Sequence, residues 1–216
     1  MTITIREPGS ALTHFAGVIL AIFAAFPLLI KAAIRGNALT VTAMAVFMSS
    51  MLLLYSASTL YHSISFTGAA LKKFRKMDHM MIFVMIAGSY TPVCLLKLGG
   101  RKGMILLIVI WTLALVGMTV KYCWITCPKW FSSVIYIAMG WTCVFVLPEL
   151  RVNLPAGAFA WLLAGGIVYT AGGVIYALKL PLFKQRPNFG NHELFHLFVL
   201  GGSICHYICM YCFLAD

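Results

Sequence analysis

The last apolar run of the chain, residues 192–213, reads HELFHLFVLGGSICHYICMYCF. As an α-helix it is long enough to cross a hydrocarbon core about 30 Å thick, which takes roughly 20 residues. Its first turns carry His192 and His196, and residues four apart lie on one face of a helix with Cβ atoms about 5 to 6 Å apart. Two imidazoles in this arrangement can reach one metal ion. The run therefore predicts a membrane-spanning helix that begins with part of a metal site.

The composition of the chain predicts an integral membrane protein. Hydrophobic residues make up 62% of the 216 residues and charged residues only 10%, which excludes a water-soluble globule. The loops leave no room for a soluble domain, so we expect an all-α fold, a seven-transmembrane helix bundle that forms one domain over residues 1–216. The approximate spans are 11–33, 39–62, 78–96, 104–122, 130–147, 159–178 and 192–213.

Two further features bear on how the chain is processed. The first span is too long for the apolar part of a secretory signal peptide, so we expect a retained helix. The seven cysteines are odd in number and follow no secreted-scaffold spacing, so the sequence does not predict a disulfide framework.

The basic residues predict the orientation in the membrane. When the loops are assigned alternately to the two sides, ten of the sixteen Lys and Arg residues fall on the side of the N-terminus, and the positive-inside rule then places the N-terminus in the cytoplasm and the C-terminus outside. These ten are Arg6, Lys72, Lys73, Arg75, Lys76, Lys121, Lys129, Lys179, Lys184 and Arg186. The other six are Lys31, Arg35, Lys97, Arg101, Lys102 and Arg151.

The net charge of +11 could suggest a nucleic-acid-binding protein. Basic residues spread over the membrane ends of the helices are better explained by topology and by anionic lipid headgroups. We therefore expect membrane lipids as partners and no nucleic acid. The sequence leaves the oligomeric state open, including a homo-oligomer.

The predicted topology gathers several polar residues at one end of the bundle. His62 closes the second span, Asp78 and His79 open the third, and His192 and His196 open the seventh, all on one side of the membrane. Each has an ordinary alternative: His62 could favour a helix C-terminus, Asp78 could be an N-cap, and the histidine pair could anchor the helix at the interface. We favour shared metal binding, because three histidines and one carboxylate otherwise need separate reasons to converge.

Short motifs that extend along most of the chain also carry a resemblance to a known family. They are Glu7-Pro8 with Thr13-His14, Ser58-Thr59-Leu60-Tyr61-His62, Asp78-His79, the run AGSYTP at 87–92, and Asn191-His192 with His196 and His206. In these motifs the chain resembles hemolysin III, the bacterial branch of the PAQR (progestin and adipoQ receptor) family.

The resemblance implies seven helices in a bacterial cytoplasmic membrane and a Zn2+ site near the cytoplasmic face. It implies His62, His192 and His196 as the zinc ligands, with Asp78 in contact with the metal through water. It also implies kinship with a wider set of membrane proteins that includes alkaline ceramidases.

A zinc site with three protein ligands suggests hydrolysis. The fourth tetrahedral position is open to water, whose pKa zinc lowers to about 7. Asp78 could take the water's proton and pass it to a leaving amine or alkoxide, while Ser58, one turn before His62, could orient a ligand or donate to an oxyanion. A site at the helix ends lies where acyl linkages meet the headgroup region. We therefore predict hydrolysis of a lipid amide or ester, with Asp78 and Ser58 as catalytic residues.

A protease is a weaker alternative. Residues 192–196 match the zincin pattern His-Glu-x-x-His, with Glu193 at the position of the general base. The extended pattern needs glycine and histidine where the chain has Val199 and Gly202, and no later glutamate could serve as third ligand. Since His62 supplies a better third ligand, we expect Glu193 to act as a charged residue at the helix start.

Two other functional classes stay open. The zinc could be a structural element of a non-enzymatic homeostasis or receptor-like protein, and a fourth protein ligand such as His79 would favour that class. A pore-forming haemolysin is less favoured, because the ionisable groups gather at one end and the fourth to sixth spans are almost wholly apolar. His206 lies fourteen residues beyond His192, about 21 Å deeper, so we expect it to bond a neighbouring helix instead of the metal.

Overall fold

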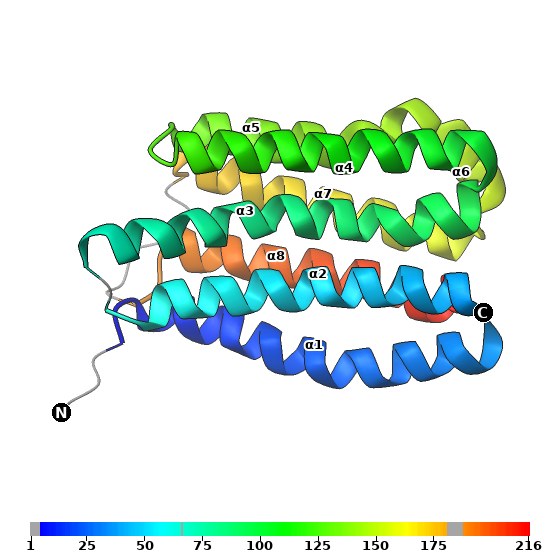
Figure 1. Cartoon of the computed structure of the whole chain (residues 1–216), viewed down its shortest axis with the longest axis horizontal. Helices are drawn as coiled ribbons and strands as arrows, with labels where there is room; N and C mark the ends of the chain where they lie inside the picture. The colour runs from blue at the N-terminus through cyan, green and yellow to red at the C-terminus, as the bar shows by residue number, and fades with distance from the viewer. Residues whose placement is uncertain (1–4, 66, 181–187) are drawn as a thin grey trace.

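The computed structural model describes residues 5–65, 67–180 and 188–216, and within these ranges it contains seven helical segments long and apolar enough to cross a membrane (Figure 1). The prediction of an all-α bundle with seven spans is thereby confirmed. The segments are α1 (Pro8–Arg35), α2 (Ala38–Ser63), α3 (Gly68–Pro92) with η1 (Val93–Leu98), α4 (Gly100–Cys123), α5 (Lys129–Gly140) with η2 (Trp141–Val146) and α6 (Leu147–Asn153), α7 (Ala156–Leu178), and α8 (Asn191–Cys209) with η3 (Met210–Leu214).

The start of the third helix differs from the prediction. We expected this span to begin at Asp78, but α3 begins at Gly68. The basic cluster at residues 72–76 therefore lies on a helix and not in a loop, since lysine and arginine are good helix formers whose long stems carry their charges to water. Asp78 is consequently not an N-cap. It lies about 15 Å along the helix from Gly68, at 1.5 Å per residue.

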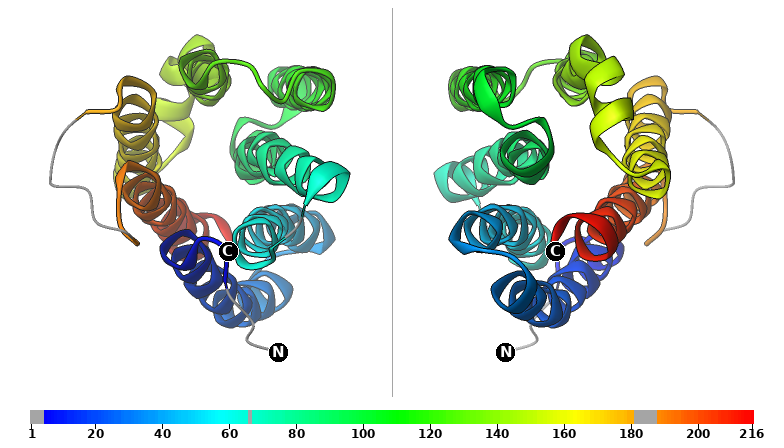
Figure 2. Two further views of the ribbon diagram at one scale, coloured as in Figure 1. Left: turned by 90° about the vertical axis from the view of Figure 1, so that its left-hand side faces the viewer. Right: turned by 90° about the vertical axis from the view of Figure 1, so that its right-hand side faces the viewer.

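The helices are arranged as a ring in chain order. Viewed along the bundle, α1 lies between α2 and α8, and α3, α4, α5 and α7 complete the circle (Figure 2). Buried side chains of α1, α2 and α8, among them Leu28, Phe47 and Tyr55, form one core cluster. Phe83 of α3 packs with Ile110 of α4 in a second. The ring thus has two packed sides, and the candidate site lies at one end of it.

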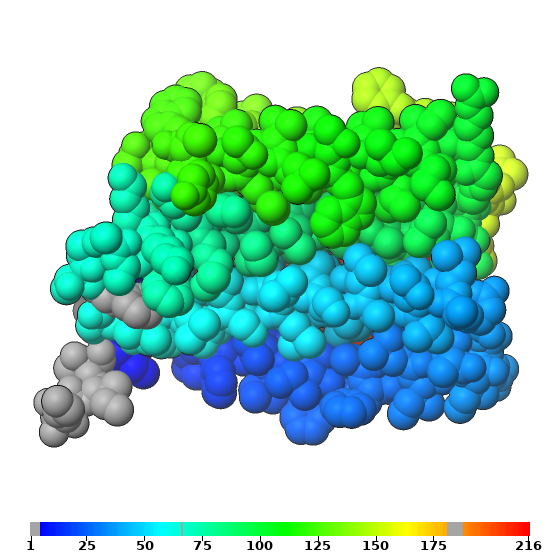
Figure 3. Space-filling view, viewed as in Figure 1, coloured from blue at the N-terminus to red at the C-terminus, as the bar shows by residue number. Residues whose placement is uncertain are grey.

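The outer surface of the ring is apolar. Large side chains such as Phe23 and Phe26 of α1 and Ile108 and Leu115 of α4 are exposed. Figure 3 shows the face of the molecule over which α1 to α4 lie. A contiguous apolar surface of this kind requires lipid cover. The seven apolar spans and this surface indicate an integral membrane protein.

Close contact between α7 and α8 depends on glycine. A Cβ at Gly165 would clash with the His206 ring, and one at Gly172 would clash with Phe198. His206 donates from Nε2 to the Leu162 carbonyl oxygen over 3.2 Å. The expectation that His206 bonds a neighbouring helix is confirmed, and the two glycines allow α7 and α8 to pack closely.

The N-in orientation remains a prediction. The structure places the two ends of the chain at opposite ends of the bundle (Figure 1), as an odd number of spans requires, but it contains no membrane to set the direction. Two of the ten residues that favour this orientation, Lys184 and Arg186, lie outside the described residues.

Candidate metal centre

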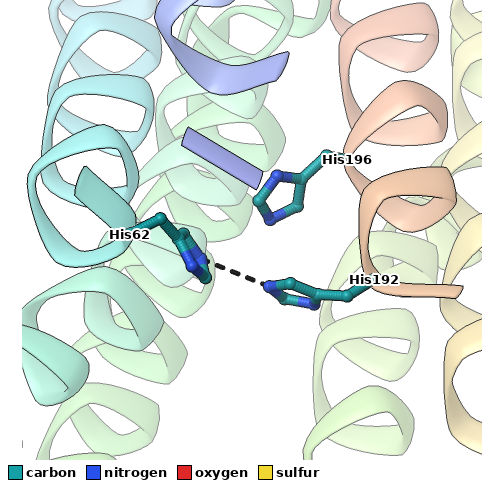
Figure 4. Close-up of side chains that lie close together, drawn as sticks. All are labelled: His62, His192 and His196. Atoms are coloured by element: carbon teal, nitrogen blue, oxygen red, sulfur yellow. Dashed lines mark hydrogen bonds between the residues drawn. The ribbon is translucent and has the colours of Figure 1, made fainter. Parts of the chain in front are cut away.

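Three histidines come together at one end of the bundle. His62 lies in the last turn of α2, while His192 and His196 lie in the first two turns of α8, and their rings face a common point (Figure 4). One ring nitrogen of each lies within 4.8 Å of the others. The structure therefore brings together all three residues that the sequence predicts as metal ligands, although they are separated by up to 134 positions.

The geometry of these imidazoles fits a tetrahedral ion. His62 Nε2 and His192 Nε2 are 3.2 Å apart. Two nitrogens that are each 2.0–2.1 Å from a tetrahedral zinc would lie roughly 3.3 Å apart. His62 and His196 are each only 2% exposed, so water cannot satisfy their inner nitrogens. A shared cation would satisfy all three rings at once.

Glu7 orients His62. The residues before α1 are held against the end of α2, where the backbone N–H of Glu7 donates to the His62 carbonyl oxygen over 3.0 Å. The Glu7 carboxylate in turn accepts a hydrogen bond from His62 Nδ1. That bond assigns the proton to Nδ1 and leaves Nε2 with a free lone pair toward the centre, as in other carboxylate–histidine–metal arrangements.

The charge state of Glu7 suits this role. The hydrogen bond with His62 lowers the pKa of Glu7 to about 2, against the opposing effect of partial burial and with help from the charge of Arg6, whose Nη2 lies 3.0 Å from Oε2. The carboxylate is therefore ionised at neutral pH. The sequence did not predict this role of Glu7, because an acidic residue before an apolar run is common at a helix start.

Thr13 orients His196 in the same manner. Its hydroxyl donates to the Ser10 carbonyl oxygen over 2.9 Å, so the 3.0 Å contact with His196 Nδ1 leaves the hydroxyl as acceptor. Nε2 of His196 is then the unprotonated nitrogen. His14, one residue further along α1, stacks on the His196 ring with centroids 3.6 Å apart and planes at 7°. The first two turns of α1 thus support the ligands of α8.

Glu193 points away from the histidine cluster. Its Oε1 accepts from the Ser10 hydroxyl, and its Oε2 accepts from the backbone N–H of Gly190 over 2.8 Å. Glu193 therefore caps α8 and joins it to α1. This agrees with its expected role at the helix start and leaves it badly placed to act as the base of a protease.

Asp78 and Ser58 lie next to the three histidines. The buried Asp78 carboxyl of α3 interacts with His62 and with the Ser58 hydroxyl. Ser58 is fully buried, and its Oγ makes no good hydrogen bond to any described residue. Asp78 is not one of the three closely spaced ligands. Nor is His79, which faces the same cavity with a buried Nδ1 that has no partner among the described residues.

A cavity of about 170 Å³ opens beside the histidines. At one end it is lined by Arg75, Lys129 and His192, and it continues between α3, α5, α7 and α8 as far as His206. On α8 the fourteen residues from His192 to His206 correspond to about 21 Å. Most of this deeper part is lined by apolar side chains such as Ile86 and Val199. The candidate metal centre therefore lies in the wall of a long, mainly apolar cavity.

These features define a class: helical membrane proteins with seven spans and a buried histidine cluster at one end. The family model described as "Haemolysin-III related" matches residues 3–207, and the chain belongs to this hemolysin III family. Curated relatives include "Hemolysin-3" of Bacillus cereus, 41% identical over 95% of this chain and 90% of that protein, and the "Hemolysin-3 homolog" of Bacillus subtilis (strain 168), 38% identical over 97% and 96%.

More distant similarity extends to animals. The "Monocyte to macrophage differentiation factor" of Homo sapiens is 25% identical over 74% of this chain and 66% of that protein. No solved structure matches the chain.

Proposed function

We propose that this protein is a zinc-dependent hydrolase of lipid amide or ester bonds in the bacterial cytoplasmic membrane, with a role in membrane lipid homeostasis. The observation that carries the proposal is the cluster of three imidazoles, two of them buried, in the wall of a membrane-embedded cavity, with a buried carboxyl group beside it. The Bacillus relatives support a bacterial membrane as the location.

Zinc is the metal that the donor set favours. Three neutral imidazoles without a cysteine or a ligating carboxylate form a familiar catalytic zinc site, which keeps one coordination position free. When bound, zinc polarises a carbonyl group and makes a water molecule more acidic. Glu7 and Thr13 hold two of the three rings in the required tautomer, so the centre is organised before the metal arrives.

Asp78 is the proposed general base and acid. It interacts with His62 and lines the same cavity as His192 and His196, so its carboxylate can receive a proton from an attacking water and return it to the leaving amine or alkoxide. Among the described residues the Ser58 hydroxyl makes no good hydrogen bond, and it interacts with the Asp78 carboxyl group. Ser58 therefore orients the carboxyl group or donates to the substrate oxygen.

The shape of the cavity favours hydrolysis over a pore. An ion pathway needs polar groups along its length, but below the histidines the cavity is largely apolar. At the opposite end Leu28, Leu150 and Leu214 are each at most 1% exposed and pack in the same core cluster. A tail of a lipid fits such a channel better than an ion does.

The second candidate is a non-enzymatic homeostasis or receptor-like protein with structural zinc. It is favoured by His14, which stacks on His196 with both ring nitrogens unpaired among the described residues. Should His14 or Asp78 complete the coordination of the metal, no open position would remain for chemistry.

The test measures zinc and turnover together. We would determine zinc per protomer by elemental mass spectrometry for wild type, His62→Ala and Asp78→Asn, and assay each against lipid amides and esters in liposomes. We expect His62→Ala to lose both zinc and turnover, and Asp78→Asn to keep zinc while losing at least about 100-fold in rate. Wild type without zinc, or Asp78→Asn with full turnover, would contradict the hydrolase proposal.

A further inference from the structure

The charges at the mouth of the cavity are not balanced. The chain has five carboxylate side chains, and all lie in the described residues. Glu7 pairs with Arg6 and His62, Glu149 with Lys102, and Asp216 with Lys31, whereas Glu193 caps α8. Asp78 interacts chiefly with His62 and Ser58. In the described part of the chain, the cations at this mouth therefore form no ion pair.

Two of these cations line the cavity directly. Arg75 lies on α3 one turn before His79, and Lys129 begins α5 across the mouth. They are close enough to repel each other. Lys129 Nζ sits 4.4 Å from the centre of the Tyr176 ring, which is itself 5.4 Å from the His192 ring. One aromatic side chain thus separates a free ammonium group from a candidate metal ligand.

A third cation lies behind this surface. Lys121 is only 2% exposed, and its ammonium donates to Cys127 Sγ over 3.0 Å and to the Ser132 hydroxyl. Cys127 and Ser132 both line the cavity. A buried ammonium without a carboxylate is unfavourable unless other charge compensates it.

The pKa of the Cys127 thiol reflects the positive charge in this region. Burial raises the pKa of its thiol, yet the hydrogen bonds from Ser132 and Lys121 outweigh burial, so the pKa lies below its ordinary value. The protein's own groups thus give partial compensation for Lys121, while among the described residues no carboxylate pairs with Arg75 or Lys129.

We propose that the cavity mouth formed by Arg75, Lys129 and the Lys121–Ser132 pair binds a phosphate group of the lipid whose acyl chain occupies the apolar channel. A guanidinium and an ammonium that line the same opening suit a phosphate, because arginine binds it through two parallel hydrogen bonds and lysine as a point charge. His79, with its unpaired buried Nδ1, adds a donor one turn from Arg75.

The phosphate site defines the class of substrate. Only the cleavage of that substrate rests on the proposed function. With the phosphate at the mouth and the acyl chain toward His206, the linkage between them passes the histidine cluster. The substrate is then a phosphate-bearing lipid with an ester-linked or amide-linked acyl chain. Neutral lipids without phosphate would lose the contacts at the mouth.

Other basic residues of α3 provide a matched control. Lys72 and Lys73 are exposed on the same helix and do not line the cavity. They would attract bulk anionic headgroups through the general surface potential. A double substitution Lys72→Gln/Lys73→Gln removes as much charge as Arg75→Gln/Lys129→Gln but leaves the proposed site intact.

The experiment measures binding and not turnover. A fluorescent dialkylglycerol phosphate, whose ether chains cannot be hydrolysed, would be titrated against the full chain in neutral nanodiscs, beside the same dialkylglycerol without phosphate. We expect the phosphate probe to bind at least about tenfold more tightly, a difference of about 1.4 kcal/mol. Arg75→Gln/Lys129→Gln should remove this preference, Arg75→Lys/Lys129→Arg should restore most of it, and Lys72→Gln/Lys73→Gln should keep it.

Three outcomes would overturn the proposal. Equal binding of the two probes would exclude phosphate recognition, and a preference lost equally in Lys72→Gln/Lys73→Gln would make it a general surface effect. Displacement by inorganic phosphate as effectively as by unlabelled lipid would assign the site to the free anion. Because the probe carries no scissile bond, repeating the titration with His62→Ala separates this site from the hydrolase proposal: binding kept in an inactive protein supports the phosphate site even if hydrolysis fails.

Discussion

The two ends of the helix bundle use their carboxylates differently. At the far end, Lys31 pairs with Asp216 and Lys102 with Glu149 at the surface, while leucines close the interior. At the end with the histidines, Glu7 is used to orient His62, and Arg75 and Lys129 have no ion pair among the described residues. Each side-chain carboxylate of the far end thus pairs with a lysine, whereas Glu7 and Glu193 at the histidine end orient His62 and cap α8.

Removal of a metal ligand should give the largest difference between the two ends. We expect His62→Ala to reduce bound zinc to background, because two remaining imidazoles on α8 cannot close a tetrahedral site. His206→Gln, about 21 Å deeper on α8, should keep its zinc. Elemental mass spectrometry on the purified variants would measure this, and equal losses in both would mean that the metal follows folding and not the ligand set.

Packing at the far end should affect stability without affecting the metal. Leu28 is fully buried in the core cluster, so Leu28→Ala should lower the free energy of unfolding by about 2–5 kcal/mol. Unfolding in mixed micelles would show the change, and a chelator titration should show an unchanged zinc affinity. A weaker zinc affinity in this variant would mean that the two ends are coupled.

Carboxylates at the two ends should differ in their effect on the metal. Glu7→Gln removes the ionised acceptor that fixes the His62 tautomer, so we expect zinc affinity to fall by about 10–100-fold. Glu149→Gln removes only the surface partner of Lys102, so zinc affinity should stay unchanged. Competition with a chromophoric chelator distinguishes the two variants, and a similar loss in both would argue against a specific role for Glu7.

The smallest effect should come from the pH dependence of Cys127. Thiolate is the reactive form, and Lys121 and Ser132 hold the pKa of this thiol below its ordinary value. Lys121→Met should therefore move the midpoint of alkylation by iodoacetamide to higher pH and slow the reaction at neutral pH. Mass spectrometry of the fragment with Cys127 would follow this, using the exposed Cys123 in the same loop region as an internal reference. An unchanged profile would remove the evidence for a positive field behind the mouth.

The sequence predicted the parts of the site that follow from helix geometry. His192 and His196 share a face because they are four residues apart. His62 lies near them because the end of the second span and the start of the seventh span are on the same side of the membrane. Asp78 was placed at the right end for a wrong reason, since it lies three turns inside α3 instead of at its start. The position of Asp78 within its helix depends on whether the basic cluster at residues 72–76 is part of that helix. Hydrophobic periodicity does not decide this point.

Contacts across elements were beyond sequence reasoning. The hydrogen bonds of Glu7 with His62 and of Thr13 with His196 depend on how the start of α1 packs against α2 and α8. Likewise, the lack of an ion pair at Arg75 and Lys129 among the described residues depends on where all five carboxylates find their partners. Tertiary packing, and not local pattern, determines both.

The link between α1 and α8 also sets an order of events in biosynthesis. Glu7 and Thr13 leave the ribosome first among the residues of the site, and His192 and His196 leave it almost last. No partial chain that lacks α8 can hold the metal with three ligands. Metal loading would therefore report that all seven helices have been inserted and that the first turns of α1 and α8 have met.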